Sequence, residues 1–296
     1  MPVSTQEATV GLFRLAQRTP FNIAPERGEK LANEIFGTRK WSLNPSATAA
    51  NFYAIPAEAK LYLSYAGLAS LWALSHVAFN VMDVASRHQR EDKKDGQDHI
   101  DIGEYFAALR LGEYAAYARS LFHADAAWPI NLAKPNIEAD FNSVDGRINN
   151  LFFGALSWII LHEIAHVHHG DQLLIPKNLR VNQEFQADDF ATRWILDDAG
   201  TGLKREFRVL MIAVALTWLF LNESEVGRGA NHPPAILRFR EAVALFNMGS
   251  RSPGLENAAY VLKAILDPKT PPPISDTPRD SFEWVSGRLE ELFPPS

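Results

Sequence analysis

The residues of this chain best suited to chemistry are His162, Glu163 and His166, which end an apolar run that begins at Leu151. On a helix, residues four apart share one face, so the two imidazoles can bind one cation, with a carboxylate beside them to accept a proton from water. The apolar run predicts a buried helix, in which ionisable groups need partners. The pattern therefore favours a metal site over two solvated histidines.

A third metal ligand must lie elsewhere, because a catalytic zinc usually has three protein ligands and one water. One known arrangement adds a histidine in the pattern HExxHxxGxxH. That pattern fails here, since position 169 is His169 in place of glycine and position 172 is Gln172 in place of histidine.

A carboxylate fits better as the third ligand. Glu184 lies 18 residues after His166 (184 − 166 = 18), and Asp188 lies four residues further, on the same face of a second expected helix. Gly170 ends the first helix, so the second can return alongside it. We predict one catalytic Zn²⁺ bound by His162, His166 and Glu184, with Asp188 accepting a hydrogen bond from a zinc-binding imidazole.

Two further histidines follow the motif. His169 shares the face of His166 and would be a substitute ligand if Glu184 were misassigned. The alternative is that His168 and His169 lie at a helix C-terminus, where the helix dipole favours partly protonated imidazoles.

A second group of polar residues lies downstream, where His232 precedes two prolines that can start a helix. A histidine in such an entry loop can donate to the oxyanion formed when water attacks a carbonyl. Arg238 could pair with Asp188, Glu184 or another carboxylate of the site. The alternative is an ordinary loop with a surface histidine and arginine.

These motifs resemble known families. His162-Glu-Ile-Ala-His166 with Glu184-Phe-Gln-Ala-Asp188 resembles the gluzincins, which are zinc peptidases with a glutamate ligand. The His232-Pro-Pro segment with its arginine resembles heat-shock and CaaX-processing membrane metallopeptidases. The run from Leu161 to Asp171 resembles the soluble, Lit-type phage-exclusion peptidases of bacteria.

The resemblance covers about residues 150–240. It implies that His162, His166 and Glu184 bind zinc, that Glu163 is the general base and that His232 is an oxyanion donor. For a Lit-type peptidase it also implies a specific cytosolic protein substrate, cleaved in response to a phage signal.

Composition narrows the function further. A net charge of −6 over 296 residues argues against binding to nucleic acid or to an anionic membrane. The absence of cysteine excludes disulfides, thiolate metal sites and cysteine nucleophiles. The start lacks a basic segment followed by an apolar one, so we expect a cytoplasmic protein. Val209–Leu221 is too short to span a membrane, and Leu61–Met82 is interpreted as a core helix.

The elements that position these residues are mostly helical. We expect a mainly α fold with at most a small sheet, a zincin-like peptidase core in which the active-site helix and the Glu-bearing helix pack side by side. Pro129–Phe141 is the predicted extended segment, Ser86–Asp101 a charged loop and Asp267–Arg279 a linker. The expected helices are 7–17, 27–36, 58–86, 102–124, 147–169, 181–198, 203–223, 233–247, 255–266 and 281–293.

Three regions are expected: a helical N-terminal region over 1–140, the catalytic core over 141–250, and a C-terminal part over 251–296 that ends in a short amphipathic helix. The function we predict is that of a zinc-dependent endopeptidase, with water activated by zinc and Glu163 and with a possible regulatory partner. The alternatives are a non-catalytic regulatory or interaction protein with a structural zinc site, and a membrane-associated metallopeptidase.

Overall fold

The computed structural model describes residues 3–37, 41–95, 107–172, 174–229 and 232–295. It is mainly helical with one small sheet, as the sequence predicts. The helices are α1 (Thr5–Ala16), α2 (Thr19–Ile23), α3 (Gly28–Lys30), α4 (Tyr65–Asp95), α6 (Leu111–Ser120), α7 (Val144–His169), α8 (Lys177–Leu196), α9 (Leu203–Val226), α10 (Ala235–Ala244), α11 (Pro253–Leu266) and α12 (Pro278–Leu292). The strands are β1 (Ser42–Ser46), β2 (Phe52–Ile55) and β3 (Lys60–Ser64).

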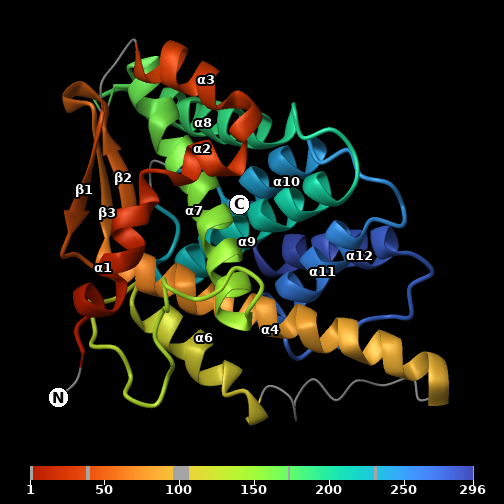
Figure 1. The fold of residues 1–296 in the computed structure, drawn as a ribbon. Helices are drawn as coiled ribbons and strands as arrows, with labels where there is room; N and C mark the ends of the chain where they lie inside the picture. The colour runs from red at the N-terminus through yellow and green to blue at the C-terminus, as the bar shows by residue number, and fades with distance from the viewer. Residues whose placement is uncertain (1–2, 38–40, 96–106, 173, 230–231, 296) are drawn as a thin grey trace.

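Helix α7 lies at the centre of the molecule, between the sheet on one side and α9 on the other (Figure 1). Its start is set by Ser143, whose hydroxyl accepts the backbone N–H of Gly146. Gly154 lets α9 approach closely, because a Cβ there would collide with the Met211 side chain. Most of α7 between Gly146 and Val167 is buried, which explains why the run from Leu151 to Leu161 is largely apolar on all faces.

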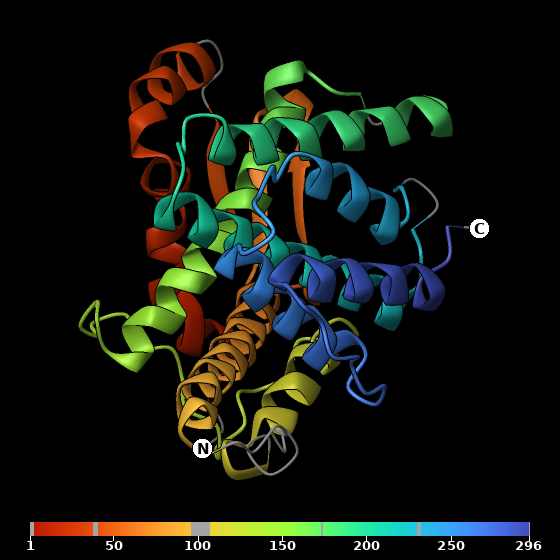
Figure 2. The same ribbon diagram turned by 90° about the vertical axis from the view of Figure 1, so that its right-hand side faces the viewer.

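Helix α8 packs alongside α7, as predicted, and the indole N–H of Trp158 on α7 donates to the Thr192 hydroxyl on α8 at 2.9 Å. Helix α10 packs against α8 in turn, at the end of the molecule away from α4 and α6 (Figures 1 and 2). Three neighbouring helices can therefore contribute to one site.

The sheet has the order β1-β3-β2, with β1 parallel and β2 antiparallel to β3. The prediction of a helix over 58–86 is wrong at its start, because Lys60–Ser64 form the central strand. Leu61 and Leu63 alternate with less buried residues there, which is the period of a strand. Strand β2 is an edge strand that borders α7.

Three other sequence predictions differ from the structure. Pro129–Phe141 contains turns and no strand, and only the preceding residue, Trp128, forms an isolated bridge with Val3. Residues 27–36 form short 3₁₀, α and π turns in place of one helix. The expected loop over 86–101 is helical up to Asp95, because Arg, Glu and Lys are good helix formers. Residues 96–106 lie outside the described part.

The hydrophobic core draws on all three regions expected from the sequence, from Leu12 through Phe152 to Leu289. The C-terminal helix α12 packs onto it through Phe282, Val285 and Leu289. The domain boundaries themselves stay a prediction.

Among the described residues, three helices are long and apolar enough to cross a membrane by length and composition alone: Tyr65–Arg87 within α4, α7 and α9. The run Val209–Leu221, predicted as too short, is thus part of a 24-residue helix. Between 67% and 83% of the most apolar window of each is buried inside the protein, so packing within the fold already accounts for much of their hydropathy.

Candidate metal centre

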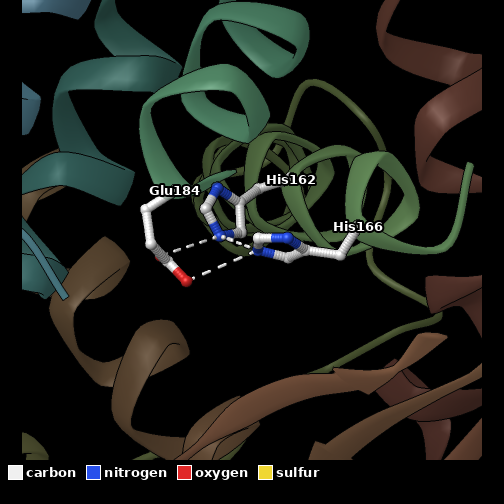
Figure 3. A group of neighbouring side chains, drawn as sticks. All are labelled: His162, His166 and Glu184. Carbon is white, nitrogen blue, oxygen red and sulfur yellow. Dashed lines mark hydrogen bonds and ion pairs between the residues drawn. The ribbon is translucent and has the colours of Figure 1, made fainter. Parts of the chain in front are cut away.

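Residues from two adjacent helices meet at the C-terminal half of α7. His162 and His166 lie one turn apart on α7, and Glu184 faces them from α8 (Figure 3). The two Nε2 atoms are 3.1 Å apart, and the Glu184 oxygens lie 3.5 Å from His162 Nε2 and 3.6 Å from His166 Nε2. One ligand atom from each residue lies within 4.8 Å of the others. The fold thus gathers the three residues proposed from their spacing.

A buried carboxylate contacts the ring nitrogen of His162 that does not face Glu184. Its Nδ1 lies 2.9 Å from Asp188 Oδ1, and Asp188 is only 1% exposed. Arg238 on α10 donates to both oxygens of Asp188 at 2.7 Å, so the carboxylate is paired in two-pronged geometry. Burial raises the pKa of Asp188, but the Arg238 charge and its hydrogen bonds lower it overall. Asp188 is therefore a fixed anion that orients the imidazole.

The surroundings of His162 favour a cation. Burial lowers its pKa, but the hydrogen bonds with Asp188 and Glu184 outweigh burial and raise the pKa to about 10. Burial likewise raises the pKa of Glu184, while the imidazoles of His162 and His232 bring it well below the ordinary value. The same carboxylates that stabilise a proton here would stabilise a bound metal ion.

His166 has a carboxylate partner of its own, which the sequence interpretation missed. Its Nδ1 lies 2.7 Å from Asp171 Oδ2. Asp171 was assigned no role at the site from the sequence alone. The signal was Gly170, since a helix that ends in a left-handed glycine turns the next residue back towards its last turn.

The donor set fits a metal such as zinc. Each Nδ1 faces a carboxylate and donates its proton there, which leaves Nε2 as the ring nitrogen that can bind a metal ion. The two Nε2 atoms are 3.1 Å apart, so a cation shared between them, whether a proton or a metal ion, fits the raised pKa of His162. Glu184 Oε2 is also buried, and it lies 3.5 Å from His162 Nε2 and 3.1 Å from His232 Nδ1. Two nitrogens and one carboxylate are the ligands of a catalytic zinc with an open position.

Glu163 lies beside the cluster in a cleft of about 640 Å³. The cleft is bounded by α7, α8, α9 and by residues 51–56, which include all of β2. Glu163 itself is 8% exposed. A carboxylate beside a candidate metal site and a cleft is an arrangement that suits hydrolysis of a bound substrate.

His232 and Arg238 are both brought to the site. His232 Nδ1 lies 3.1 Å from Glu184 Oε2, and its side chain is 59% exposed. Arg238 is buried and also lies 3.9 Å from Glu184. His168 and His169, in contrast, lie exposed at the end of α7 near Phe190 and outside the metal group found in the described residues.

Comparison with known proteins assigns the chain to a family. The family model described as peptidase U49 matches residues 61–258, which include every site residue named above. The chain is also 25% identical over 254 residues to the curated "Cell death peptidase" of Escherichia coli (strain K12), covering 81% of this chain and 82% of that protein. No solved structure matches. Both matches confirm the expectation of a Lit-type peptidase family. The chain therefore belongs to the peptidase U49 family.

Proposed function

We propose that this peptidase is a zinc-dependent endopeptidase, with His162, His166 and Glu184 as the zinc ligands. The observation that carries the proposal is the convergence of two imidazole Nε2 atoms and one buried carboxylate at the wall of an open cleft. Such a site supplies three protein ligands and leaves a coordination position for water or substrate.

When bound, zinc supplies Lewis-acid chemistry that polarises a carbonyl group and acidifies water. Glu163 accepts the proton of the attacking water and passes it to the amine that leaves when the peptide bond breaks. Its place beside His162 on α7, inside the cleft, supports this role.

His232 and Arg238 have separate tasks in this proposal. His232 is exposed to the cleft and can donate a hydrogen bond to the oxyanion that forms on the attacked carbonyl. Arg238 contacts no reacting atom and acts by holding Asp188, which holds His162.

Strand β2 supports a protein substrate. It lines the cleft, and among the described strands it pairs with β3 alone, so its other edge has backbone groups for an extended peptide. A peptide added there as a further strand would pass along the wall of the cleft that faces the metal centre.

The proposal includes a cytoplasmic location and a role in phage exclusion. Both rest on the resemblance to the Lit-type family, which implies a soluble peptidase with a cytosolic protein substrate. A membrane-associated peptidase is the second candidate, because three helices in the described part of the chain are long and apolar enough to span a bilayer. Fractionation of cells that express the full chain would separate the two.

The Glu163→Gln variant tests the function directly. The substitution keeps the size of the side chain and removes the base, so we expect stoichiometric zinc and a loss of peptidase activity of about 10²- to 10⁴-fold. The readout is N-terminal labelling proteomics of cells expressing the wild type, Glu163→Gln or the control Glu241→Gln, which makes the same change on the exposed face of α10.

New N-termini should appear with the wild type and with Glu241→Gln and should be absent with Glu163→Gln. Undiminished cleavage by Glu163→Gln with zinc in place would contradict the proposed mechanism.

A further inference from the structure

The two histidines of the metal centre are supported by different parts of the fold. Asp188, behind His162, comes from α8 and is neutralised by Arg238 on α10. Asp171, behind His166, comes from the segment that directly follows α7, and both side chains of that pair are largely buried. Among the described residues, no lysine or arginine pairs with Asp171. In this part of the chain, its carboxylate contacts the His166 side chain at Nδ1.

The backbone at the end of α7 fixes Asp171 against His166. Gly170 adopts the left-handed conformation with φ of 69°. The N–H of Gly170 donates to Val167 O at 3.2 Å, and the N–H of Asp171 donates to His166 O at 3.0 Å. These two bonds form a Schellman motif, which turns the chain back under the last helical turn. The carboxylate of Asp171 reaches the imidazole of His166 as a consequence.

We propose that Asp171 is a positioning residue that orients His166 for metal binding. It accepts the Nδ1 proton of His166, fixes the tautomer that leaves Nε2 free, and makes the imidazole a stronger ligand. The inference rests on the proposed zinc site, and it adds to that site a residue on the α7–α8 connection.

A merely structural residue at this place would act differently. If Asp171 only ended the helix, its backbone N–H would be enough for that task. Loss of its side chain would then change the stability of the fold or nothing at all, and Zn²⁺ affinity would stay the same. A positioning role instead changes metal affinity while the apo protein keeps its stability. The Zn²⁺ affinity of the apo protein therefore distinguishes the two roles without any substrate.

The experiment compares Asp171→Ala, Asp171→Asn and a control in the purified full chain. The control is Asp189→Ala, which removes an exposed carboxylate that pairs with Arg193 on the surface of α8. Zn²⁺ dissociation constants are measured by competition with a chromophoric chelator. Thermal unfolding of the apo proteins and the visible spectra of the Co²⁺-loaded proteins are recorded alongside.

We expect Asp171→Ala to weaken Zn²⁺ binding by about 10- to 100-fold and to alter the Co²⁺ spectrum. Asp171→Asn should lose less affinity, because its amide oxygen still accepts the Nδ1 proton. Asp189→Ala should bind Zn²⁺ like the wild type.

Wild-type affinity in Asp171→Ala would overturn the positioning role alone. If the alanine variant does not fold, the asparagine variant decides, and wild-type affinity there would overturn the role equally. A wild-type protein that binds no Zn²⁺ would overturn the proposed function as well.

Discussion

Arg238 and Asp188 form the buried ion pair on which the geometry of His162 depends. Both residues are less than a tenth exposed, and the guanidinium donates to both carboxylate oxygens. Removal of one partner from a buried pair leaves the other charge without compensation, which costs far more than the pair itself contributes. The stability of the fold around the candidate metal site therefore depends on a residue of α10.

The Arg238→Ala variant should lower the free energy of unfolding by about 3–5 kcal/mol, because Asp188 would be left as a buried, unpaired charge. Urea denaturation of the apo protein measures this change. The matched control is Arg240→Ala on the same helix, since Arg240 forms an exposed pair with Glu290 and should cost about 0–1 kcal/mol. Equal effects of the two substitutions would contradict the structural role of Arg238.

At this scale, periodicity predicted more of the site than any other signal. His162 and His166 had to share a face, and Glu184 and Asp188 had to share another, because a helix repeats every 3.6 residues. Asp171 could not be found in that way, since its place depends on the turn made at Gly170. The partner of Arg238 was left open for the same reason: it depends on how the chain before α10 returns to α8.

At the scale of helices and strands, periodicity failed to predict strand β3. Strand β3 runs directly into α4, so Leu61 and Leu63 were counted with the apolar helix that follows. Short apolar runs do not distinguish strand from helix when no turn residue separates them. Strand β1 contains Pro45, which is tolerated because β1 lies at an edge of the sheet. The sheet was consequently predicted in the wrong segment, although its small size was right.

The contact between the N-terminal turns and α9 depends on Glu26. This carboxylate pairs with the buried Arg208 at 2.6 Å and with Lys204 at 2.9 Å. Burial raises the pKa of Glu26, but the hydrogen bonds from Arg208 and Lys204 lower it overall, from 4.5 to about 2. Because the pKa of Glu26 is lower in the folded protein, its ion pairs stabilise the fold above pH 4.5. This stabilisation is lost as the pH falls towards 2.

The Glu26→Gln variant should therefore be less stable than the wild type at neutral pH, with a difference that shrinks below pH 4.5 and disappears near pH 2. Urea unfolding at a series of pH values measures this difference. Glu290→Gln, which changes an exposed surface pair, serves as the control and should show little difference at any pH. A difference for Glu26→Gln that is constant over the whole range would contradict the ion-pair account.

On the scale of the whole molecule, one hydrophobic core positions the site. Helix α7 passes through that core, so the residues at its C-terminal half are fixed by packing on several sides. The expected mainly helical class follows from composition and periodicity. The burial of the apolar segments in α4, α7 and α9 was predicted and is confirmed. Which of these helices pack on one another could not be read from hydropathy, because an apolar helix looks the same whichever neighbour covers it.

The central claim is that this fold builds a catalytic zinc site from α7 and α8. Crystals of the Zn²⁺-loaded protein, with diffraction measured on both sides of the zinc absorption edge, test it most directly. We expect one anomalous peak about 2.0–2.2 Å from His162 Nε2, His166 Nε2 and a Glu184 oxygen, with no fourth protein ligand. A peak elsewhere, or a fourth side chain that completes the coordination, would contradict the claim.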